Sequence, residues 1–146
     1  MSLTEKINND IKEAMKSRDD KKLAALRAVK AEILILNTSG QSVSEEAEMK
    51  MLQKMVKQRQ ESAALYEEQN RMDLAEPEIY QADIIGAYLP KQLSNDELTS
   101  EVKAVIDSLG ASGLKDMGKV MGAATQKLTG KASGKAISDK VRELLA

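Results

Sequence analysis

The last third of the chain concentrates the residues best suited to bind an anion. Five lysines and one aspartate lie between Lys115 and Lys135, a local net charge of +4. The whole 146-residue chain has 22 basic and 23 acidic residues and a net charge of −1. Because ammonium groups bind phosphate oxygens, we expect any polyanionic partner to contact this segment first.

Helical spacing assigns two glycines of this segment to the lysine face. On a helix over 116–129, the apolar residues Met117, Val120 and Leu128 fall on one side, and Gly118, Lys119 and Gly122 fall on the other. A glycine inside a helix costs on the order of 1 kcal/mol relative to alanine, and on this face it gains nothing for packing unless another backbone approaches. The predicted contact residues are Lys115, Gly118, Lys119, Gly122, Lys131 and Lys135.

Three interpretations of the glycine face stay open. The approaching backbone is a sugar–phosphate strand, or it is a helix of a partner protein. Alternatively, the glycines serve a helix crossing inside the tail or have no function on a solvated face. Ser133 is expected to cap the next helix. The free N–H groups there, beside Lys131 and Lys135, are either a general anion site or only part of the glycine C-cap and serine N-cap that connect two helices.

Residues 113–120 match the spacing of a phosphate-binding loop, Gly-x-x-x-x-Gly-Lys, but lack its hydroxyl. Val120 stands where serine or threonine would hold magnesium. The motif also needs a preceding strand, whereas the residues before it have helical periodicity. The sequence therefore predicts no nucleotide site here.

Composition excludes most catalytic chemistry. The chain has no cysteine and no histidine, so thiol nucleophiles, imidazole bases and thiolate or imidazole metal sites are absent. The only aromatic residues are Tyr66, Tyr80 and Tyr88, too few for an extended base-stacking platform. We expect no catalytic residues, no metal site and no cofactor.

Hydrophobic periodicity predicts an all-α protein, since no segment alternates as a strand would. Four helices are expected in the first part of the chain. The first follows Ser2, the second follows a break at Asp19-Asp20 and ends near Leu36, and the third runs from Ser44 to Asn70. The fourth is opened by an Asp73–Glu76 capping box and distorted by Pro77. Three more are expected in the tail: one from Ser94 to Gly110, one over about 116–129, and one over about 133–145.

The chain is expected to form two domains. Residues 1–90 form a four-helix N-terminal domain, and residues 95–146 form a three-helix tail domain. Tyr88-Leu89-Pro90 ends a helix, and residues 90–94 are expected to form a protease-sensitive hinge. Residues 1–90 have 13 basic and 16 acidic residues, and residues 91–146 have 9 and 7, so the positive charge belongs to the tail.

Five residues are predicted to have structural roles. Arg59 lies near the edge of a core face, where its guanidinium would pair with Asp73 or Glu78. The five residues are Arg59, Arg71, Asp73, Glu78 and Pro90.

The order of these motifs resembles that of the YqeY-like proteins. Lys57-Gln58-Arg59-x-x-Ser62, Arg71-x-Asp73-Leu74 and Tyr88-Leu89-Pro90 carry the resemblance in the first part. The segments 115–122 and 130–135 are similar to the GatB/YqeY tail domain. Two positions differ from the family pattern: Gln81 replaces an expected acidic residue, and Pro77 lies within a helix.

The resemblance implies a helical domain joined to a three-helix tail. A similar tail ends the B subunit of the tRNA-dependent amidotransferase, where it contacts tRNA. We therefore expect a non-catalytic accessory protein that binds tRNA or another structured RNA. A helical protein–protein adaptor is the alternative, and a contribution to glutamine-dependent carbon–nitrogen ligase activity is a distant third.

Location and assembly are also predicted from the sequence. No run approaches the 18 apolar residues of a membrane span, and the first ten residues are too polar for a signal peptide. We expect a monomeric, cytoplasmic protein that does not contact membranes.

Overall fold

The computed structural model describes residues 1–40 and 43–146, and in these ranges it contains seven α-helices, one short 3-10 helix and no β-strand. The prediction of an all-α protein is therefore confirmed. Across the same ranges, no helix combines the length and the apolar character needed to cross a membrane. The chain divides into two compact units: unit 1 is Met1–Leu89, and unit 2 is Pro90–Ala146.

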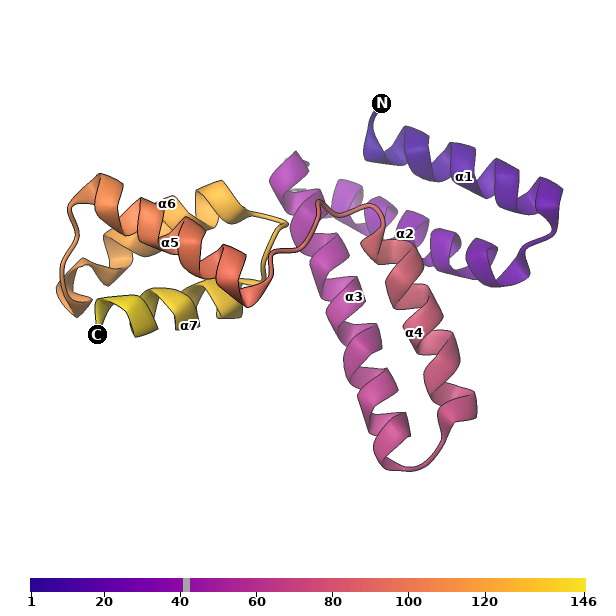
Figure 1. The fold of residues 1–146 in the computed structure, drawn as a ribbon. Helices are drawn as coiled ribbons and strands as arrows, with labels where there is room; N and C mark the ends of the chain where they lie inside the picture. The colour runs from indigo at the N-terminus through magenta and orange to yellow at the C-terminus, as the bar shows by residue number, and fades with distance from the viewer. Residues whose placement is uncertain (41–42) are drawn as a thin grey trace. The chain divides into compact units, whose positions relative to one another are not determined.

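Each unit is assembled from consecutive helices (Figure 1). The helices of unit 1 are α1 (Leu3–Ser17), α2 (Asp20–Thr38), α3 (Glu45–Glu68) and α4 (Met72–Gly86). The helices of unit 2 are α5 (Asn95–Leu109), the 3-10 helix η1 (Leu114–Asp116), α6 (Met117–Leu128) and α7 (Gly134–Leu145).

Serine side chains begin four of the helices, as predicted. Each serine oxygen accepts a hydrogen bond from the backbone N–H three residues later in the chain. The distance is 3.1 Å at Ser2, Ser44 and Ser133 and 3.2 Å at Ser94. At α5 the Glu97 carboxylate also accepts the Ser94 N–H at 3.0 Å, which completes a capping box. These bonds satisfy amides that have no partner within a helix, and so define where the helices begin.

The predicted capping box of α4 is wrong. The helix begins at Met72, and Asp73 lies within its first turn. Both Asp73 carboxylate oxygens accept hydrogen bonds from the Arg71 guanidinium, at 3.0 and 2.9 Å, and no side chain caps the helix. The helix then continues through Pro77, because the hydrogen bond that proline cannot donate is lost at an exposed position.

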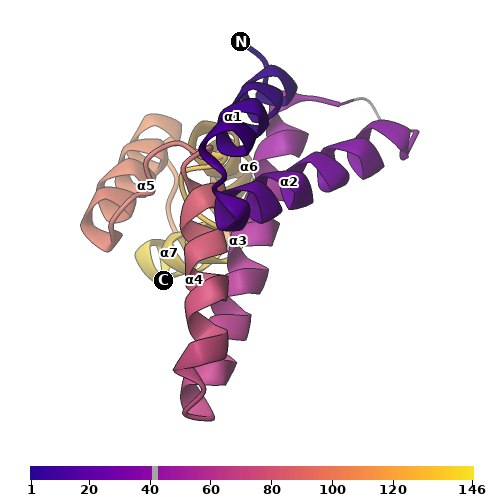
Figure 2. The same cartoon turned by 90° about the vertical axis from the view of Figure 1, so that its right-hand side faces the viewer.

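Unit 1 is built on the antiparallel hairpin of α3 and α4, and the α1–α2 pair packs near the open end of this hairpin (Figures 1 and 2). Its core combines residues of all four helices. The buried members are aliphatic side chains and one methionine: Ile7, Ala14, Leu26, Val29, Ile33, Leu52, Met55 and Ile85.

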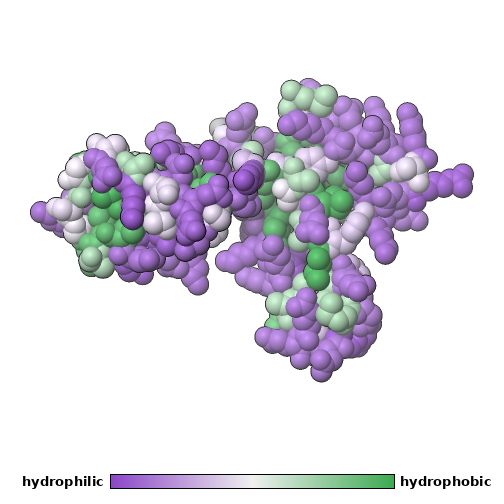
Figure 3. All heavy atoms as spheres, in the orientation of Figure 1, coloured by the Kyte–Doolittle hydropathy of each residue, from purple (hydrophilic) through white to green (hydrophobic). Residues whose placement is uncertain are grey.

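The other half of the α3–α4 hairpin, toward the turn at residues 69–71, packs through small residues. The side chains buried there are Ala63, Ala75 and Ala82, and none belongs to the main core. The larger apolar residues of this half stay between 38% and 58% exposed: Leu65, Met72, Leu74 and Ile79. Apolar surface is visible along this part of the hairpin in Figure 3.

Unit 2 is a three-helix bundle around a core without aromatic residues. Its buried side chains come from α5, α6 and α7: Leu98, Val102, Val105, Val120, Ala124, Leu128, Ile137, Val141 and Leu145. This core orients α6, and therefore decides which of its faces reaches solvent.

Candidate nucleic-acid interface

The two faces of α6 separate as the spacing predicted. Val120, Ala124 and Leu128 are at most 1% exposed and belong to the core of unit 2. Gly118, Lys119 and Gly122 are exposed on the opposite side. Burial of the apolar side therefore presents the glycine and lysine face to solvent.

Both glycines of α6 face open space. A Cβ atom added at Gly118 or Gly122 would meet no atom within 4 Å among the described residues. A helix crossing inside the tail would place atoms there, so the structure does not support that interpretation of the two glycines. The backbone of α6 is thus directly accessible over one helical turn.

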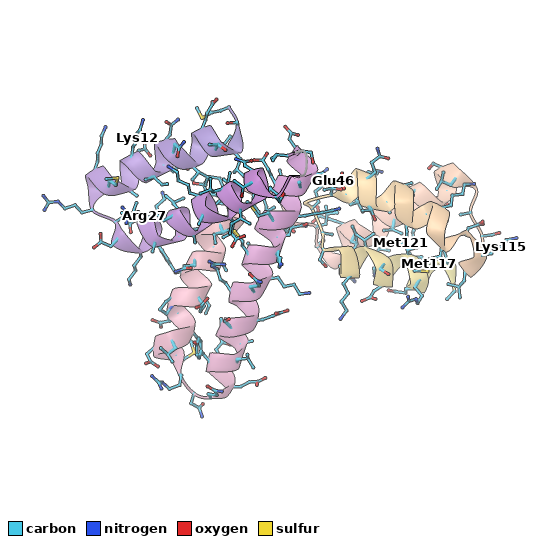
Figure 4. All side chains as sticks on the ribbon, turned by 180° about the vertical axis from the view of Figure 1, so that it is seen from behind. Lys12, Arg27, Glu46, Lys115, Met117 and Met121 are labelled. Carbon is cyan, nitrogen blue, oxygen red and sulfur yellow. The ribbon has the colours of Figure 1, made fainter. Side chains whose placement is uncertain are left out.

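The four predicted lysines lie at the two ends of α6 rather than in one cluster. Lys115 lies in η1 and Lys119 in the first turns of α6, whereas Lys131 follows α6 and Lys135 lies in the first turn of α7. Figure 4 shows Lys115 at the end of the bundle where α6 begins. Because 12 residues of α-helix span about 18 Å, the two pairs of lysines are separated by about the length of α6. We call these four lysines, together with Gly118 and Gly122, the lysine strip.

A fifth lysine of this segment is neutralised by a neighbouring helix. The Lys127 ammonium lies 3.0 Å from the Glu101 carboxylate of α5. In contrast, Lys115, Lys119, Lys131 and Lys135 are exposed and form no ion pair with the described residues. The sequence count therefore overstated the free positive charge by one.

The loop that carries Lys131 is held by the segment that enters unit 2. The Leu93 N–H donates to the Lys131 carbonyl at 3.0 Å, and the Gln92 amide donates to the carbonyls of Gly130 at 2.7 Å and Pro90 at 2.8 Å. This arrangement brings exposed Lys91 to the same end of unit 2 as Lys131. Sequence reasoning missed Lys91 because it assigned residues 91–93 to a hinge.

The glycine motif at 113–120 does not form a phosphate-binding loop. It follows α5 rather than a strand, and its residues form η1 and the start of α6. Gly113 has a φ of 75°, and the Asp116 carboxylate accepts the Ser112 N–H at 2.9 Å. The Ser112 amide is thereby occupied, and the segment has a helix before it where a phosphate-binding loop needs a strand.

The structural residues predicted in unit 1 have partly different partners. Arg59 donates from Nε to the Gln81 side-chain oxygen at 3.0 Å and from Nη1 to the Met55 carbonyl at 3.2 Å. The predicted Arg59 pairing with Asp73 or Glu78 is wrong, because Asp73 pairs with Arg71. Gln81, where the resemblance led us to expect an acidic residue, supplies the acceptor instead.

Hydrogen bonds shift the pKa of two carboxyl groups. The Arg71 guanidinium lowers the pKa of Asp73, mainly through its hydrogen bonds. The Ser94 N–H lowers the pKa of Glu97, and Lys91 adds a smaller electrostatic contribution. Partial burial, followed by repulsion from Glu45, raises the pKa of Glu48 at the start of α3. Among the described residues, no three acidic side chains come together to hold a metal ion.

Two curated relatives align with most of this chain. One is altered inheritance of mitochondria protein 41, mitochondrial, from Pyrenophora tritici-repentis, which is 26% identical over 144 residues covering 96% of this chain and 79% of the relative. The protein of the same name from Clavispora lusitaniae is 28% identical over 113 residues, covering 76% of this chain and 66% of the relative. Both relatives are named as mitochondrial proteins, and this finding contradicts the predicted cytoplasmic location.

The family comparison covers nearly the whole chain. The family described as Yqey-like protein matches residues 4–145, which include every helix of the structure except the first residue of α1. The resemblance to the YqeY-like proteins inferred from the motifs is confirmed. The chain belongs to the Yqey-like protein family.

Proposed function

We propose that this protein is a non-catalytic accessory protein that binds structured RNA, with tRNA as the first candidate, through the lysine strip of unit 2. The observation that supports this most directly is the charge pattern of the strip. Four exposed lysines without an ion pair flank a helical turn whose two glycines face open space. Lysines neutralise phosphates, and the bare backbone lets a sugar–phosphate strand approach α6.

The composition of the strip suggests recognition by shape. All three tyrosines lie before residue 90, so unit 2 has no aromatic side chain on which a base could stack. Contacts to phosphates and 2′-hydroxyls are the ones that lysines and exposed backbone can make. We expect little dependence on nucleotide sequence.

The number of contacts limits the affinity. If about three to five phosphates are neutralised, a plot of the logarithm of the association constant against the logarithm of the salt concentration should have a slope of about −2 to −4. The dissociation constant should then lie near the micromolar range. The 12 residues of α6 span about 18 Å, so an RNA that contacts both pairs of lysines must present phosphates over about this distance. A folded RNA such as tRNA meets this requirement.

The experiment compares two variants of equal charge. Fluorescent bulk tRNA is titrated with the full chain at about 50 and 200 mM salt. One variant changes Lys115, Lys119, Lys131 and Lys135 to alanine. The control variant changes four exposed lysines of unit 1 to alanine: Lys6, Lys12, Lys16 and Lys30.

We expect the strip variant to lose tRNA binding and the control variant to retain most of it. The difference arises because the control changes net charge equally but leaves the strip intact. Equal affinity of the wild type and the strip variant, or affinity that does not change with salt, would refute the proposal.

The open glycine face also supports a second candidate, an adaptor that binds a helix of a partner protein. A partner helix would pack against Gly118 and Gly122, so Gly122→Leu would abolish binding while changes to the lysines would matter less. If the lysine changes dominate instead, the adaptor interpretation fails at this surface. We assign no ligase step to the chain, because its sequence has no cysteine or histidine and its glycine motif at 113–120 does not form a phosphate-binding loop.

A further inference from the structure

The outer half of the α3–α4 hairpin carries a groove that the main core does not fill. The groove has a volume of about 260 Å³ and lies between α3 and α4. Its apolar lining is Ala63, Ala64, Ile79 and Ala82, and its charged lining is Glu67 and Asp83. Three small alanines leave the depression, and Ile79 is 38% exposed at its side.

The hairpin segment that carries the groove is strongly acidic. Residues 60–83 contain seven acidic residues and one basic residue, Arg71, and that arginine is paired with Asp73. The two carboxylates of the groove, Glu67 and Asp83, form no ion pair with the described residues. An apolar floor between unpaired carboxylates is complementary to a cationic, apolar surface.

The size and shape of the groove suggest a helix rather than a small molecule. Its volume lies below the range of about 300–1,000 Å³ typical of small-molecule pockets. It follows the stripe of residues 60, 63, 64 and 67 on α3, which is the i, i+3, i+4, i+7 spacing of one helical face. An elongated depression of this kind accepts a few side chains of an amphipathic helix.

We propose that this groove docks a basic amphipathic helix of a partner protein. Small aliphatic anchors of that helix enter the depression over Ala64 and Ala82, and its lysines or arginines pair with Glu67 and Asp83. The site is on unit 1, and it is independent of the lysine strip of unit 2. Burial of the exposed Ile79 and Met72 side chains, which are 38% and 48% exposed, would add apolar area to the contact.

Synthetic peptides test the chemistry of the partner. The probe is an 18-residue helical peptide with leucines on one face and flanking lysines. A second peptide has glutamates in place of the lysines, and a third has the same composition as the probe in scrambled order. Each is titrated with the full chain at about physiological salt, and amide NMR shifts locate the contact.

Matched variants test the location. Ile79→Ser removes an apolar side chain of the groove, and Leu74→Ser removes one of equal exposure, 38% in both cases. Five helical residues separate these positions, which places them about 140° apart around α4. In the same way Asp83→Lys reverses a charge of the groove and Glu78→Lys reverses one about 140° away.

We expect the lysine peptide to bind and the other two peptides to bind at least about tenfold more weakly. Ile79→Ser and Asp83→Lys should each weaken the lysine peptide by about tenfold, whereas Leu74→Ser and Glu78→Lys should change it by less than about twofold. The NMR shifts should centre on Ala64 and Ala82. Circular dichroism confirms that each variant is folded.

Three results would overturn the proposal. The first is equal binding of the lysine and glutamate peptides, and the second is an equal effect of the groove variants and their controls. The third is a dimer, detected by sedimentation, that dissociates on Ile79→Ser, because this result would assign the groove to a second copy of the chain.

Discussion

The Tyr88 hydroxyl donates a hydrogen bond to the Asp10 carboxylate, and this bond joins α1 to the chain just after α4. The two residues are 78 positions apart in sequence, and both are partly buried. Burial, and then the bond to Asp10, raise the pKa of Tyr88 above its ordinary value. The neutral phenol is therefore part of what holds unit 1 together.

Tyr88→Phe should destabilise the protein by about 1–2 kcal/mol at pH 7, since a hydrogen bond to a charged acceptor is lost and Asp10 keeps its partial burial. Urea unfolding measures the change. Tyr80→Phe is the control, because the Tyr80 hydroxyl makes no hydrogen bond with the described residues. Equal stability losses in the two variants would show that the Tyr88 bond contributes nothing.

The contribution of Tyr88 should disappear at high pH. A group whose pKa is raised by folding stabilises the native state fully below its unfolded pKa, about 10 for tyrosine, and loses this effect as the pH rises toward the folded value. The stability difference between the wild type and Tyr88→Phe should therefore stay constant from about pH 7 to 9 and shrink above about pH 10. A difference that grows above pH 10 would contradict the assignment.

The contact between Arg59 and Gln81 predicts a stabilising substitution. Gln81→Glu would replace a neutral acceptor 3.0 Å from the Arg59 Nε atom with a charged one, and should add about 0.5–1 kcal/mol at pH 7. Arg59 would lower the pKa of the new carboxyl, so the gain should be present above about pH 4.3 and lost as the pH falls through the folded value.

Unfolding experiments at about pH 7 and pH 3 check this prediction. Gln58→Glu is the matched control, since it adds the same charge at an exposed position of α3 one residue away. If both substitutions change the free energy of unfolding equally, the effect comes from net charge and not from the Arg59 contact.

Local signals in the sequence predicted most of the helix boundaries. A serine cap acts within three residues, and the caps at Ser2, Ser44, Ser94 and Ser133 are confirmed. Gly110 ends α5 with a φ of 62°, as its freedom in the left-handed region predicted. Asp73 is the exception, since a neighbouring arginine competes for the carboxylate that would otherwise cap α4.

Contacts between distant residues could not be predicted from spacing. The partner of Arg59 depends on how α3 and α4 are aligned, and the sequence alone does not fix that alignment. The ion pair of Lys127 with Glu101 depends in the same way on the packing of two helices. The hydrogen bond from Gln92 to the Gly130 carbonyl also joins residues that are far apart in the sequence. In the candidate site, the exposed face of α6 was predictable because it depends only on helical period, whereas the free charge of the strip was not.

Residues 90–94 were predicted to form a protease-sensitive hinge. Within this segment, the Gln92 side chain and the Leu93 N–H donate hydrogen bonds to the carbonyls of Gly130 and Lys131. Gln92→Ala removes the side-chain bonds and should raise the rate of tryptic cleavage after Lys91 by about fivefold, since about 1 kcal/mol less is needed to open the segment. Mass spectrometry of timed digests measures the rate. Gln126→Ala, at an exposed position of α6, is the control. An unchanged rate in Gln92→Ala would mean that these bonds do not protect the segment.

Gly122→Ala should separate the stability of α6 from its proposed contact with RNA. An added Cβ meets nothing within 4 Å, so alanine should stabilise unit 2 by up to about 1 kcal/mol through its higher helix propensity. The same methyl group would hold a sugar–phosphate strand away from the backbone, and tRNA affinity should fall although no charge is lost.

Ser100→Ala on α5 is the control, because it also raises helix propensity at an exposed position but lies outside the strip. Thermal unfolding and tRNA titration of the three proteins give both quantities. A Gly122→Ala protein that is more stable and binds tRNA as well as the wild type would show that the glycine face does not contact RNA.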